Sequence, residues 1–453
     1  MDTVVRSKLP VSAILRLALF IMIAVATAPA AAAAQPQSPY AAVIPLKGIV
    51  NPAMSSYLDR AITQAEGTGA AVAVLEMDTP GGLDTSMREI IKRVIAAKVP
   101  VVVYVAPSGA RAGSAGVYIT YSAHIAAMAP STNIGSAHPV AIDQSGGEQQ
   151  MSEDMRQKVT NDAVAYIKGL AQLRGRNSDW AEKAVRESVN ITAPEAVDLK
   201  VVNLVADDVP QLLEKIDGTT VSLSSGPVTL KTKGLPVQRL EMTSIESFLH
   251  IITDPTIAYI LLSLGTLALV FELSSPGAIL PGVIGGLFLL FALFGLGTLP
   301  INLTGLLLIV FGFLLFLADI FAPTHGILTA GGVISFVFGS FMLINAGDAP
   351  FLAISTSAII SVTLGLTAFF VFVVGAVVRS RRRQPVTGKA GLLGMTGRAK
   401  TELSPRGMVF VDGALWEAVS QAGIVQEGSV VKVVGQEGLT LVVDLVSGPV
   451  RDV

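Results

Sequence analysis

The sequence predicts a protein of three parts: an α/β domain, a bundle of about five transmembrane helices and a small β-barrel. Short β-rich runs alternate with helical ones from about residue 42 to 208, which is typical of βαβ units in a largely parallel sheet. Apolar stretches follow between residues 256 and 378, each near the roughly twenty residues that a bilayer requires. Beyond residue 388 the apolar pattern takes a period of two, as in a small barrel.

The composition narrows the classes of function. Of the 453 residues, 51% are hydrophobic and 15% are charged, and the net charge is -2. This balance excludes a strongly basic nucleic-acid binder and indicates a chain that lies partly in lipid. The chain has no cysteine, so a covalent mechanism must use serine, threonine, lysine or a carboxylate. We expect no metal and no other cofactor.

The N-terminus has the pattern of an export signal, which we place at residues 1–34. Arg6, Lys8 and Arg16 precede an apolar stretch at 17–28, and the alanines before Gln35 offer several cleavage sites. The alternative is a retained transmembrane anchor. In both cases the segment that follows lies outside the cytoplasm.

The α/β pattern defines a domain that we place at residues 40–235. The expected strands are 42–50, 70–77 and 99–105, with helices near 55–66 and 84–97. Thr192 and Glu195 form a capping box that begins another helix, which ends before an apolar run at 201–205.

The membrane region, residues 250–380, determines the topology of the chain. The expected spans are 256–273, 278–297, 303–320, 327–345 and 354–378. An arginine cluster at 379–383 follows the last span, and the positive-inside rule places it in the cytoplasm. An exported first domain followed by five spans also places the residues after the last span in the cytoplasm. These observations together predict a protein of the bacterial inner membrane. The fourth stretch contains Gly331 and Gly332 and is the one that could be re-entrant instead.

The C-terminal segment, residues 388–453, is expected to be soluble. Its strands are 407–411, 429–434 and 439–445, with glycines at the turns. An oligonucleotide-binding barrel usually carries basic and stacking aromatic residues, whereas this segment is near neutral and offers mainly Phe410 and Trp416. The pattern therefore favours a module that contacts proteins, not nucleic acid.

Ser114 is the candidate nucleophile. It lies among small residues, Ala112 to Gly116, shortly after an apolar strand, so an incoming carbonyl group would not be blocked. A tight turn leaves the N–H of the next residue, Ala115, free to bind an oxyanion. The glycine pair that ends at Gly82 follows the preceding strand and could supply a second N–H.

Two residues could act as the base. His138 follows Ser114 by 24 positions, and histidine has a suitable pKa without adjustment. Lys158 lies near the start of a long helix, on the shoulder of its apolar stripe, while Lys168 faces nearly the opposite side. The predicted stripe consists of Met155, Val159, Ala163, Tyr166, Leu170 and Leu173. A lysine base must be neutral, which requires a closed, apolar pocket.

Four motifs follow one another along the chain: Met-Asp-Thr-Pro-Gly-Gly at 77–82, Ala-Gly-Ser-Ala-Gly at 112–116, Lys-Val-Thr-Asn at 158–161 and Ile-Thr-Ala-Pro-Glu-Ala-Val at 191–197. In these motifs and their order the chain resembles the membrane-bound, Clp-class serine proteases of the NfeD family. A fifth segment at 321–328 and the C-terminal barrel also resemble the family's membrane and soluble parts.

The resemblance implies a Clp-like (crotonase-type) protease domain with a Ser-Lys dyad and a C-terminal OB-fold. Ser114 would be the nucleophile, Lys158 the base, and the N–H groups of Gly82 and Ala115 the oxyanion hole. A histidine at about the offset of His138 serves as base in cytosolic Clp proteases, so it stays the alternative. The resemblance also implies a stomatin-like partner and apolar substrate segments, and we expect the chain to form a homo-oligomer. A catalytically idle scaffold for such a partner is the second hypothesis.

Overall fold

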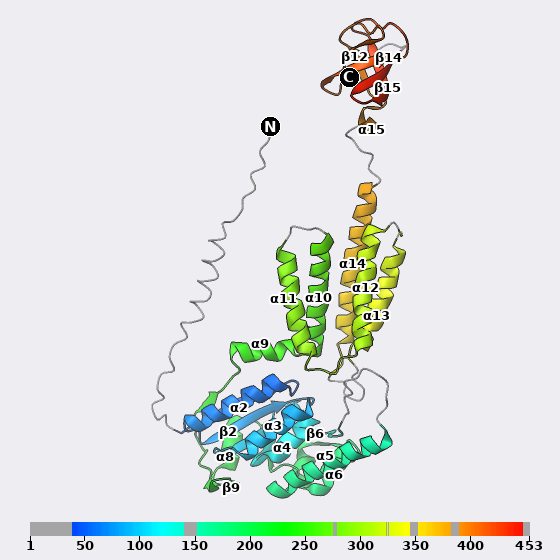
Figure 1. The fold of residues 1–453 in the computed structure, drawn as a ribbon. Coiled ribbons are helices and arrows are strands. Elements are labelled where there is room, and N and C mark those ends of the chain that lie inside the picture. Colours follow the sequence, from blue (N-terminus) through cyan, green and yellow to red (C-terminus); the bar gives the residue numbers. More distant parts are fainter. Residues whose placement is uncertain are drawn as a thin grey trace. The chain divides into compact units, whose positions relative to one another are not determined.

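A computed structural model describes residues 39–139, 152–274, 279–322, 324, 326–344, 352–381 and 389–446 (Figure 1). The predicted signal peptide, residues 1–34, lies outside the described residues. The α/β domain, the apolar helices and the C-terminal barrel are each described by themselves below.

A six-stranded parallel sheet forms the centre of the α/β domain. Its strand order is β11-β1-β2-β3-β5-β8, and every neighbouring pair is parallel. The inner strands are almost entirely apolar because both faces of the sheet are covered. The strands are β1 (Ala41–Lys47), β2 (Val72–Asp78), β3 (Val101–Val105), β5 (Ile125–Met128), β8 (Leu204–Val205) and β11 (Val237–Arg239).

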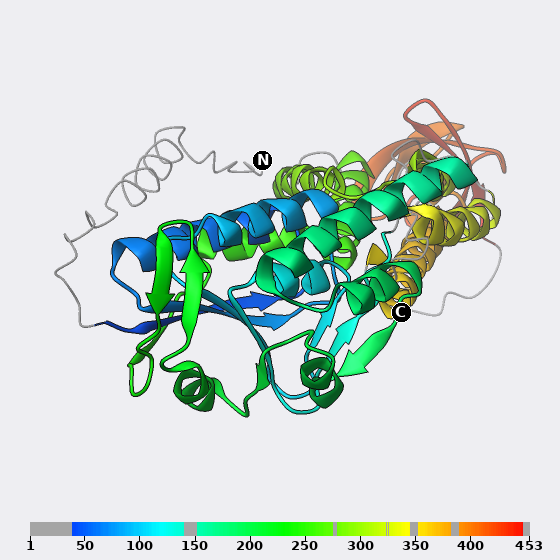
Figure 2. The same cartoon turned by 90° about the horizontal axis from the view of Figure 1, so that it is seen from below.

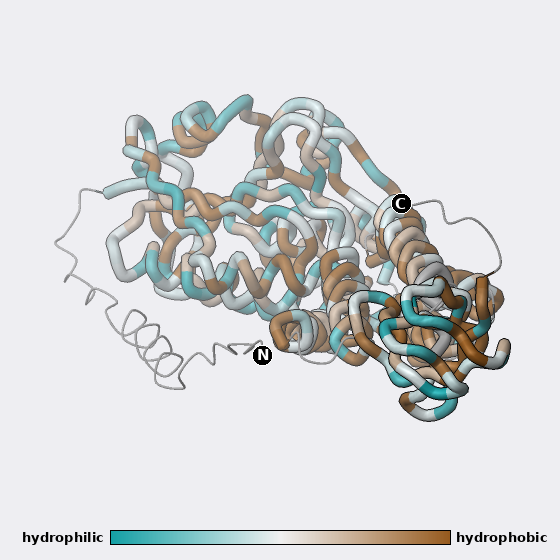
Figure 3. Tube along the Cα trace, turned by 90° about the horizontal axis from the view of Figure 1, so that it is seen from above, coloured by the Kyte–Doolittle hydropathy of each residue, from teal (hydrophilic) through white to brown (hydrophobic). Residues whose placement is uncertain are grey.

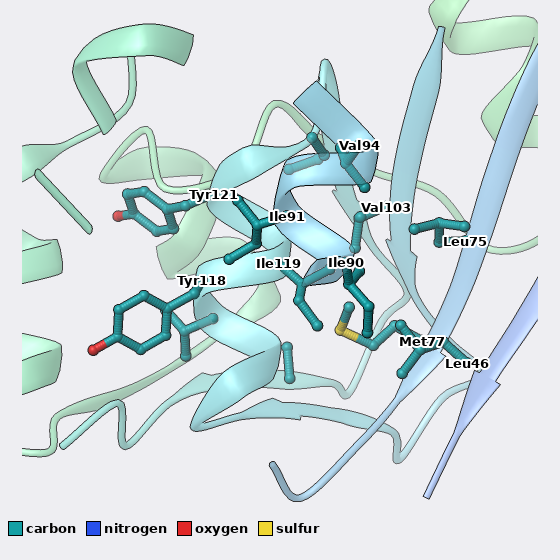
Figure 4. Close-up of a cluster of buried hydrophobic side chains, with 14 of the residues drawn as sticks. Leu46, Leu75, Met77, Ile90, Ile91, Val94, Val103, Tyr118, Ile119 and Tyr121 are labelled. Carbon is teal, nitrogen blue, oxygen red and sulfur yellow. The ribbon is translucent and has the colours of Figure 1, made fainter. Parts of the chain in front are cut away.

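Helices cover both faces of this sheet, as the view from below shows (Figure 2). The larger apolar cluster contains side chains of α2 to α7, and the smaller one, on the other face, contains those of α8. Figure 4 shows part of the larger cluster, where Ile90 and Ile119 meet Met77 between two helices and the sheet. The helices are α2 (Pro52–Gly67), α3 (Asp84–Ile95), α4 (Ala115–Ser122), α5 (Glu153–Arg174), α6 (Ser178–Arg186), α7 (Ala193–Asp198) and α8 (Val209–Ile216).

Two small sheets complete the domain. The first joins β4 (Arg111–Gly113), β6 (Asn133–Gly135) and β7 (Asn190–Thr192), and the second is the hairpin of β9 (Thr220–Leu223) and β10 (Gly226–Thr229). The chain then returns to the main sheet through β11, which pairs with β1 just beyond the predicted boundary at residue 235.

Helix α5 differs from the prediction at its two ends. Ala163 and Leu170 of its predicted apolar stripe are buried, but Met155 is 49% exposed and Leu173 54% exposed. The helix has 22 residues, or about 33 Å, whereas its neighbour α4 has 8 residues, or about 12 Å. The shorter helix cannot cover both ends of the longer one, so the outer apolar side chains face solvent.

Five apolar helices follow the short helix α9 (Ser244–Ile252), and hydrophobic residues run along them (Figure 3). The helices are α10 (Pro255–Ser274), α11 (Leu280–Leu296), α12 (Leu303–Phe321), α13 (Ile327–Met342) and α14 (Thr356–Arg381). Among the described residues, three helical stretches are long and apolar enough to cross a membrane: α10, α12 and the 18-residue stretch Thr356–Val373 of α14. The other two have 17 and 16 residues, so the predicted count of five full crossings stays a prediction.

Two carboxylates at the ends of these helices bind neighbouring backbone, as helix caps do. Glu272 accepts a hydrogen bond from the backbone N–H of Ile279 at 3.2 Å, just before α11 begins. Asp319 accepts one from the N–H of Thr329 at 3.2 Å, in the first turn of α13. These contacts assign structural roles to both residues.

The C-terminal segment is a closed five-stranded barrel that follows the short helix α15 (Lys389–Leu392). Its strand order is β12-β13-β14-β16-β15, and pairing of β12 with β15 closes it. The strands are β12 (Thr396–Ala399), β13 (Arg406–Val411), β14 (Ala414–Ser420), β15 (Val430–Glu437) and β16 (Thr440–Leu445). The α/β domain, the apolar helices and the small barrel of the predicted fold class are therefore confirmed.

Candidate active site

The residues that the sequence singled out lie around one cavity of about 540 Å³. The cavity opens beside the carboxyl ends of β2 and β3, where loops from parallel strands converge. The lining residues are Gly82, Asp84, Met87, Arg88, Ser114, Ala115, Tyr118, Ala137, His138, Pro139, Lys158, Val159, Asp162 and Ala163. All five predicted site residues are among them.

Ser114 occupies a strained turn between β4 and α4. Its φ is 50° and its ψ is -111°, a backbone conformation that residues other than glycine rarely adopt. Gly113 precedes it because a Cβ there would lie 2.9 Å from the carbonyl oxygen of Pro80. The Ser114 hydroxyl does not cap α4. The turn therefore presents a half-buried hydroxyl to the cavity, the arrangement that an exposed nucleophile requires.

The second predicted oxyanion donor, Gly82, is oriented by Val50. The N–H of Val50 donates to Gly81 at 2.9 Å, and the carbonyl of Val50 accepts from Leu83 at 2.8 Å. Gly82 lies between these bonds, so its own N–H points away from Val50. A Cβ on Gly82 would lie 2.1 Å from the carbonyl oxygen of Val50, so only glycine fits.

Ala115 is the first residue of α4, where a helix leaves its N–H groups without partners inside the helix. Among the described residues, the N–H groups of Gly82 and Ala115 have no hydrogen-bond acceptor. The N–H of Ser114 itself is occupied, because it donates to Gly135 at 3.1 Å. Two free N–H groups therefore border the cavity next to the serine.

The two lysines of α5 have different environments. Lys158 lines the cavity, two turns after Ser152, whose side chain caps the helix. Lys168 forms an ion pair with Glu182 at 2.8 Å, where the helix pattern predicted a lysine in water. Within the described part of the chain, Lys158 has no ion pair, and its side chain is exposed. The single chain thus leaves this amine free but does not enclose it.

His138 is held in one orientation by the backbone. Its Nδ1 lies 2.8 Å from the carbonyl oxygen of Val185, which can only accept, so Nδ1 carries the proton. Nε2 of the neutral ring is then an acceptor. The geometry therefore leaves His138 open as an alternative base.

Arg88 forms an ionic network on the cavity wall that sequence reasoning missed. Its guanidinium donates to Asp84 at 2.8 Å and to Asp162 at 2.6 Å, and it lies 4.4 Å from the centre of the Tyr166 ring. The spacing of four residues between Asp84 and Arg88 on one helix was a usable signal. Asp162 lies 74 positions away, so no local pattern indicated it.

Tyr118 supports the same wall. Its hydroxyl donates to the carbonyl of Ala137 at 3.0 Å, directly before His138, and its ring stacks on Tyr166 at 6.2 Å. Burial raises the pKa of Tyr118 above its usual value, so the phenol stays neutral at physiological pH. Within the described residues, no group of three or more His, Cys, Asp or Glu side chains could hold a metal ion.

Three family models match consecutive parts of the chain. They are described as the NfeD1b N-terminal domain (residues 40–225), the NfeD integral membrane domain (256–376) and the NfeD-like C-terminal, partner-binding domain (389–444). The membrane-bound protease PH1510 of Pyrococcus horikoshii is 37% identical over 410 residues, which cover 88% of this chain and 92% of that protein. The chain belongs to the NfeD family.

Two further proteins are similar to this chain. The membrane protein NfeD1b of Bacillus subtilis is 28% identical over 421 residues, covering 88% of this chain and 92% of that protein. A solved structure, the 1510-N membrane protease specific for a stomatin homolog from Pyrococcus horikoshii, is 33% identical and covers 48% of this chain and 100% of that chain, with a TM-score of 0.42. This NfeD-family chain is thus a membrane protein with several apolar helices.

Proposed function

We propose that this NfeD-family protein is a membrane-anchored serine endopeptidase with a Ser-Lys dyad. The single observation that carries the proposal is the cavity, which is lined by Ser114, by Lys158 and by Gly82 and Ala115, the residues with free N–H groups. The relative that is 37% identical over most of both chains is named as a membrane-bound protease, which supports the same class of reaction.

The geometry supports acyl transfer in two steps. Neutral Lys158 takes the proton of the Ser114 hydroxyl as its oxygen attacks the carbonyl carbon of a peptide. The N–H groups of Gly82 and Ala115 stabilise the negative charge on the former carbonyl oxygen. The protonated lysine then gives its proton to the leaving amine, which breaks the peptide bond. A water molecule then gives a proton to the lysine and attacks the acyl-enzyme, and the lysine passes that proton to the Ser114 oxygen as the acyl group leaves.

Apolar segments are the substrates that this cavity favours. Met87, Val159 and Ala163 contribute apolar wall, which gains stability when an apolar side chain displaces water. The same substrate would cover the exposed Lys158 and remove water from its amine, which favours the neutral form that a base requires. Substrate binding would thereby complete the pocket that the single chain leaves open.

We assign a stomatin-like membrane protein as partner and substrate source. The solved relative is specific for a stomatin homolog, and the C-terminal model is described as partner-binding. The barrel exposes apolar side chains that a protein contact could cover: Leu415 at 59%, Ile424 at 69% and Leu439 at 80%.

The decisive experiment replaces Ser114 in the purified full-length protein. Ser114→Ala should abolish cleavage of peptides on the carboxyl side of apolar residues, while circular dichroism and the thermal midpoint stay unchanged. A serine-reactive phosphonate should label the wild type at Ser114 and leave the variant unlabelled. Cleavage that persists in the variant, in the absence of contaminating protease, would contradict the assignment.

The alternative is an idle scaffold that organises the partner through its membrane helices and barrel. The exposure of Lys158 favours it, because the single chain does not form the closed, apolar pocket that a lysine base requires. The phosphonate experiment separates the two. An idle scaffold would bind the stomatin-like partner and remain unlabelled with that partner present.

We also propose that the α/β domain is extracytoplasmic and the barrel cytoplasmic, as an odd number of spans requires. A phosphatase that works only outside the cytoplasm should be active when it is fused after Asp208. A fluorescent protein that folds in the cytoplasm should be fluorescent when it is fused after the C-terminus. If both fusions report the same side, the number of crossings is even. The 16-residue helix α13 would then be the first candidate for a segment that does not cross.

A further inference from the structure

The oxyanion donor Gly82 belongs to a loop that is held by the segment after β1. Val50 makes two backbone hydrogen bonds around Gly82, at 2.9 and 2.8 Å. The buried hydroxyl of Thr79 donates to the carbonyl of Gly48 at 2.7 Å and accepts from the N–H of Gly81 at 3.1 Å. The position of the Gly82 N–H is therefore set by residues 48–50 as much as by its own loop.

The next residue, Asn51, connects this segment to helix α9. Its side-chain oxygen accepts from the N–H of Met54 at 2.9 Å and caps α2, and it lies 3.2 Å from Nδ1 of His250. Its side-chain nitrogen donates to the hydroxyl of Thr253 at 2.7 Å. Asn51 is 4% exposed and Thr253 5% exposed, so these bonds are shielded from water.

Thr253 lies at the point where the α/β domain continues into the membrane helices. It is the C-cap of α9, two positions before Pro255, the first residue of α10. Its hydroxyl also lies 3.0 Å from the carbonyl of Leu249, so it completes the last turn of α9. The residue thus joins one end of a membrane helix to the segment that fixes Gly82.

Helix α9 is fixed on both sides. On the side of α2, Arg60 forms an ion pair with Glu246 at 2.6 Å. On the side of α11, the rings of Phe248 and Phe291 meet at 5.1 Å, and Gly295 leaves room for the carbonyl of Ile252, which a Cβ would approach to 2.1 Å. A helix held in this way can transmit a displacement of the membrane helices to Asn51.

We infer that Asn51 and Thr253 are positioning residues that couple the first membrane helix to the oxyanion donor Gly82. This inference rests on the proposed function, in which Gly82 binds the oxyanion. Neither residue lines the cavity. Each acts through Val50, whose backbone bonds orient the Gly82 N–H. A partner that moves the membrane helices would thereby change the rate of the chemical step.

The test compares two substitutions of Thr253 in the full-length protein. Thr253→Ser keeps the hydroxyl, whereas Thr253→Val keeps the shape and leaves the buried Asn51 amide without an acceptor. We expect Thr253→Val to lower kcat about ten-fold, within the range for an unsatisfied buried group, with KM changed less than about two-fold. Phosphonate labelling of Ser114 should slow by the same factor. Thr253→Ser should restore both rates.

A second substitution approaches the junction from the other side. Asn51→Ser keeps a residue that caps α2 well but is too short to reach Thr253. It should lower kcat as Thr253→Val does, and the double variant should lose less than the product of the two single losses, because both substitutions remove the bond between Asn51 and Thr253. If Thr253→Val does not fold, Asn51→Ser carries the test alone.

The outcomes separate the inference from the proposed function. A wild type that is neither labelled at Ser114 nor active would overturn the proposed function. A wild type that cleaves, beside a Thr253→Val variant with unchanged kcat, would overturn only the coupling. So would equal losses in the serine and valine variants, or a loss confined to KM.

Discussion

Glycine has different structural roles at the cavity and between the membrane helices α10 and α11. At the cavity, Gly82 and Gly113 bring backbone close together so that a loop can present free N–H groups and the Ser114 hydroxyl. In the helix pair, a Cβ on Gly285 would lie 2.8 Å from the carbonyl oxygen of Gly265, so the two glycines bring helix against helix and fill the space between them. At the cavity, close backbone packing leaves polar groups free to bind a substrate. Between α10 and α11, it brings the two helices into direct contact.

The difference shows where chemistry can be sought in this chain. Several polar side chains inside the described membrane helices have local partners: the hydroxyl of Ser263 donates to Tyr259 at 2.9 Å, and that of Ser340 donates to Phe336 at 2.7 Å. At the cavity, the Ser114 hydroxyl and the Lys158 amine lack such partners among the described residues. Polar groups that no protein atom occupies are available to a substrate, so the chemistry is sought at the cavity and not among the membrane helices.

The first prediction asks which unpaired group is the base, and it carries the largest effect. Lys158→Ala should lower the cleavage rate by about 10²–10⁴, the usual contribution of general-base catalysis, and His138→Ala should lower it far less. The cleavage rate of the wild type should rise with pH at values well above about 6.5, the pH near which an ordinary histidine titrates.

The reverse ranking of these two variants would make the site a Ser-His one. His138 already has the geometry for that role, with Nδ1 bonded to Val185 and Nε2 free to accept. Lys168→Ala is the matched control on the same helix. Its loss breaks the ion pair with Glu182 away from the cavity and should leave the rate unchanged.

The second prediction tests the close approach at the cavity. Gly82→Ala should lower the cleavage rate by about 10²–10³, the typical loss of one oxyanion donor. The added Cβ would lie 2.1 Å from Val50, so the loop must shift and take the N–H with it. Gly67→Ala, at the end of α2, is the control because nothing lies within 4 Å of its Cβ. Equal activity of the two variants would refute the role of Gly82.

Much of this site could be predicted from the sequence because its parts are local. Ser114 lies among small residues shortly after β3, and Gly82 follows β2, the neighbouring parallel strand. The rules for parallel sheets therefore place both residues at the same edge of the sheet. Lys158 required only the helical period of α5. Each of these predictions depends on residues within about one turn or one strand of the functional group.

The parts that could not be predicted join distant positions. The bond between Asn51 and Thr253 spans 202 residues, and the pairing of β1 with β11 links the two ends of the domain. Neither contact has a local pattern, because a side chain or edge strand can find its partner only after the sheet has formed. The same holds for Asp162 and Arg88.

The last prediction tests the close approach in the membrane helices, where the expected effect is smallest. Gly285 and Gly286 are adjacent on α11, but a Cβ on Gly285 would meet Gly265 at 2.8 Å and Ala268 at 2.9 Å, whereas nothing lies within 4 Å of one on Gly286. Gly285→Ala should therefore lower the free energy of unfolding by about 1–3 kcal/mol through overpacking. Gly286→Ala should leave it unchanged, as measured by thermal unfolding in detergent micelles. Because the two substitutions add the same methyl group to the same helix, any difference between them reports the contact with α10 and not a general effect of alanine. Equal stability of the two variants would mean that α10 and α11 do not pack closely, and the contrast between the two uses of glycine would fail.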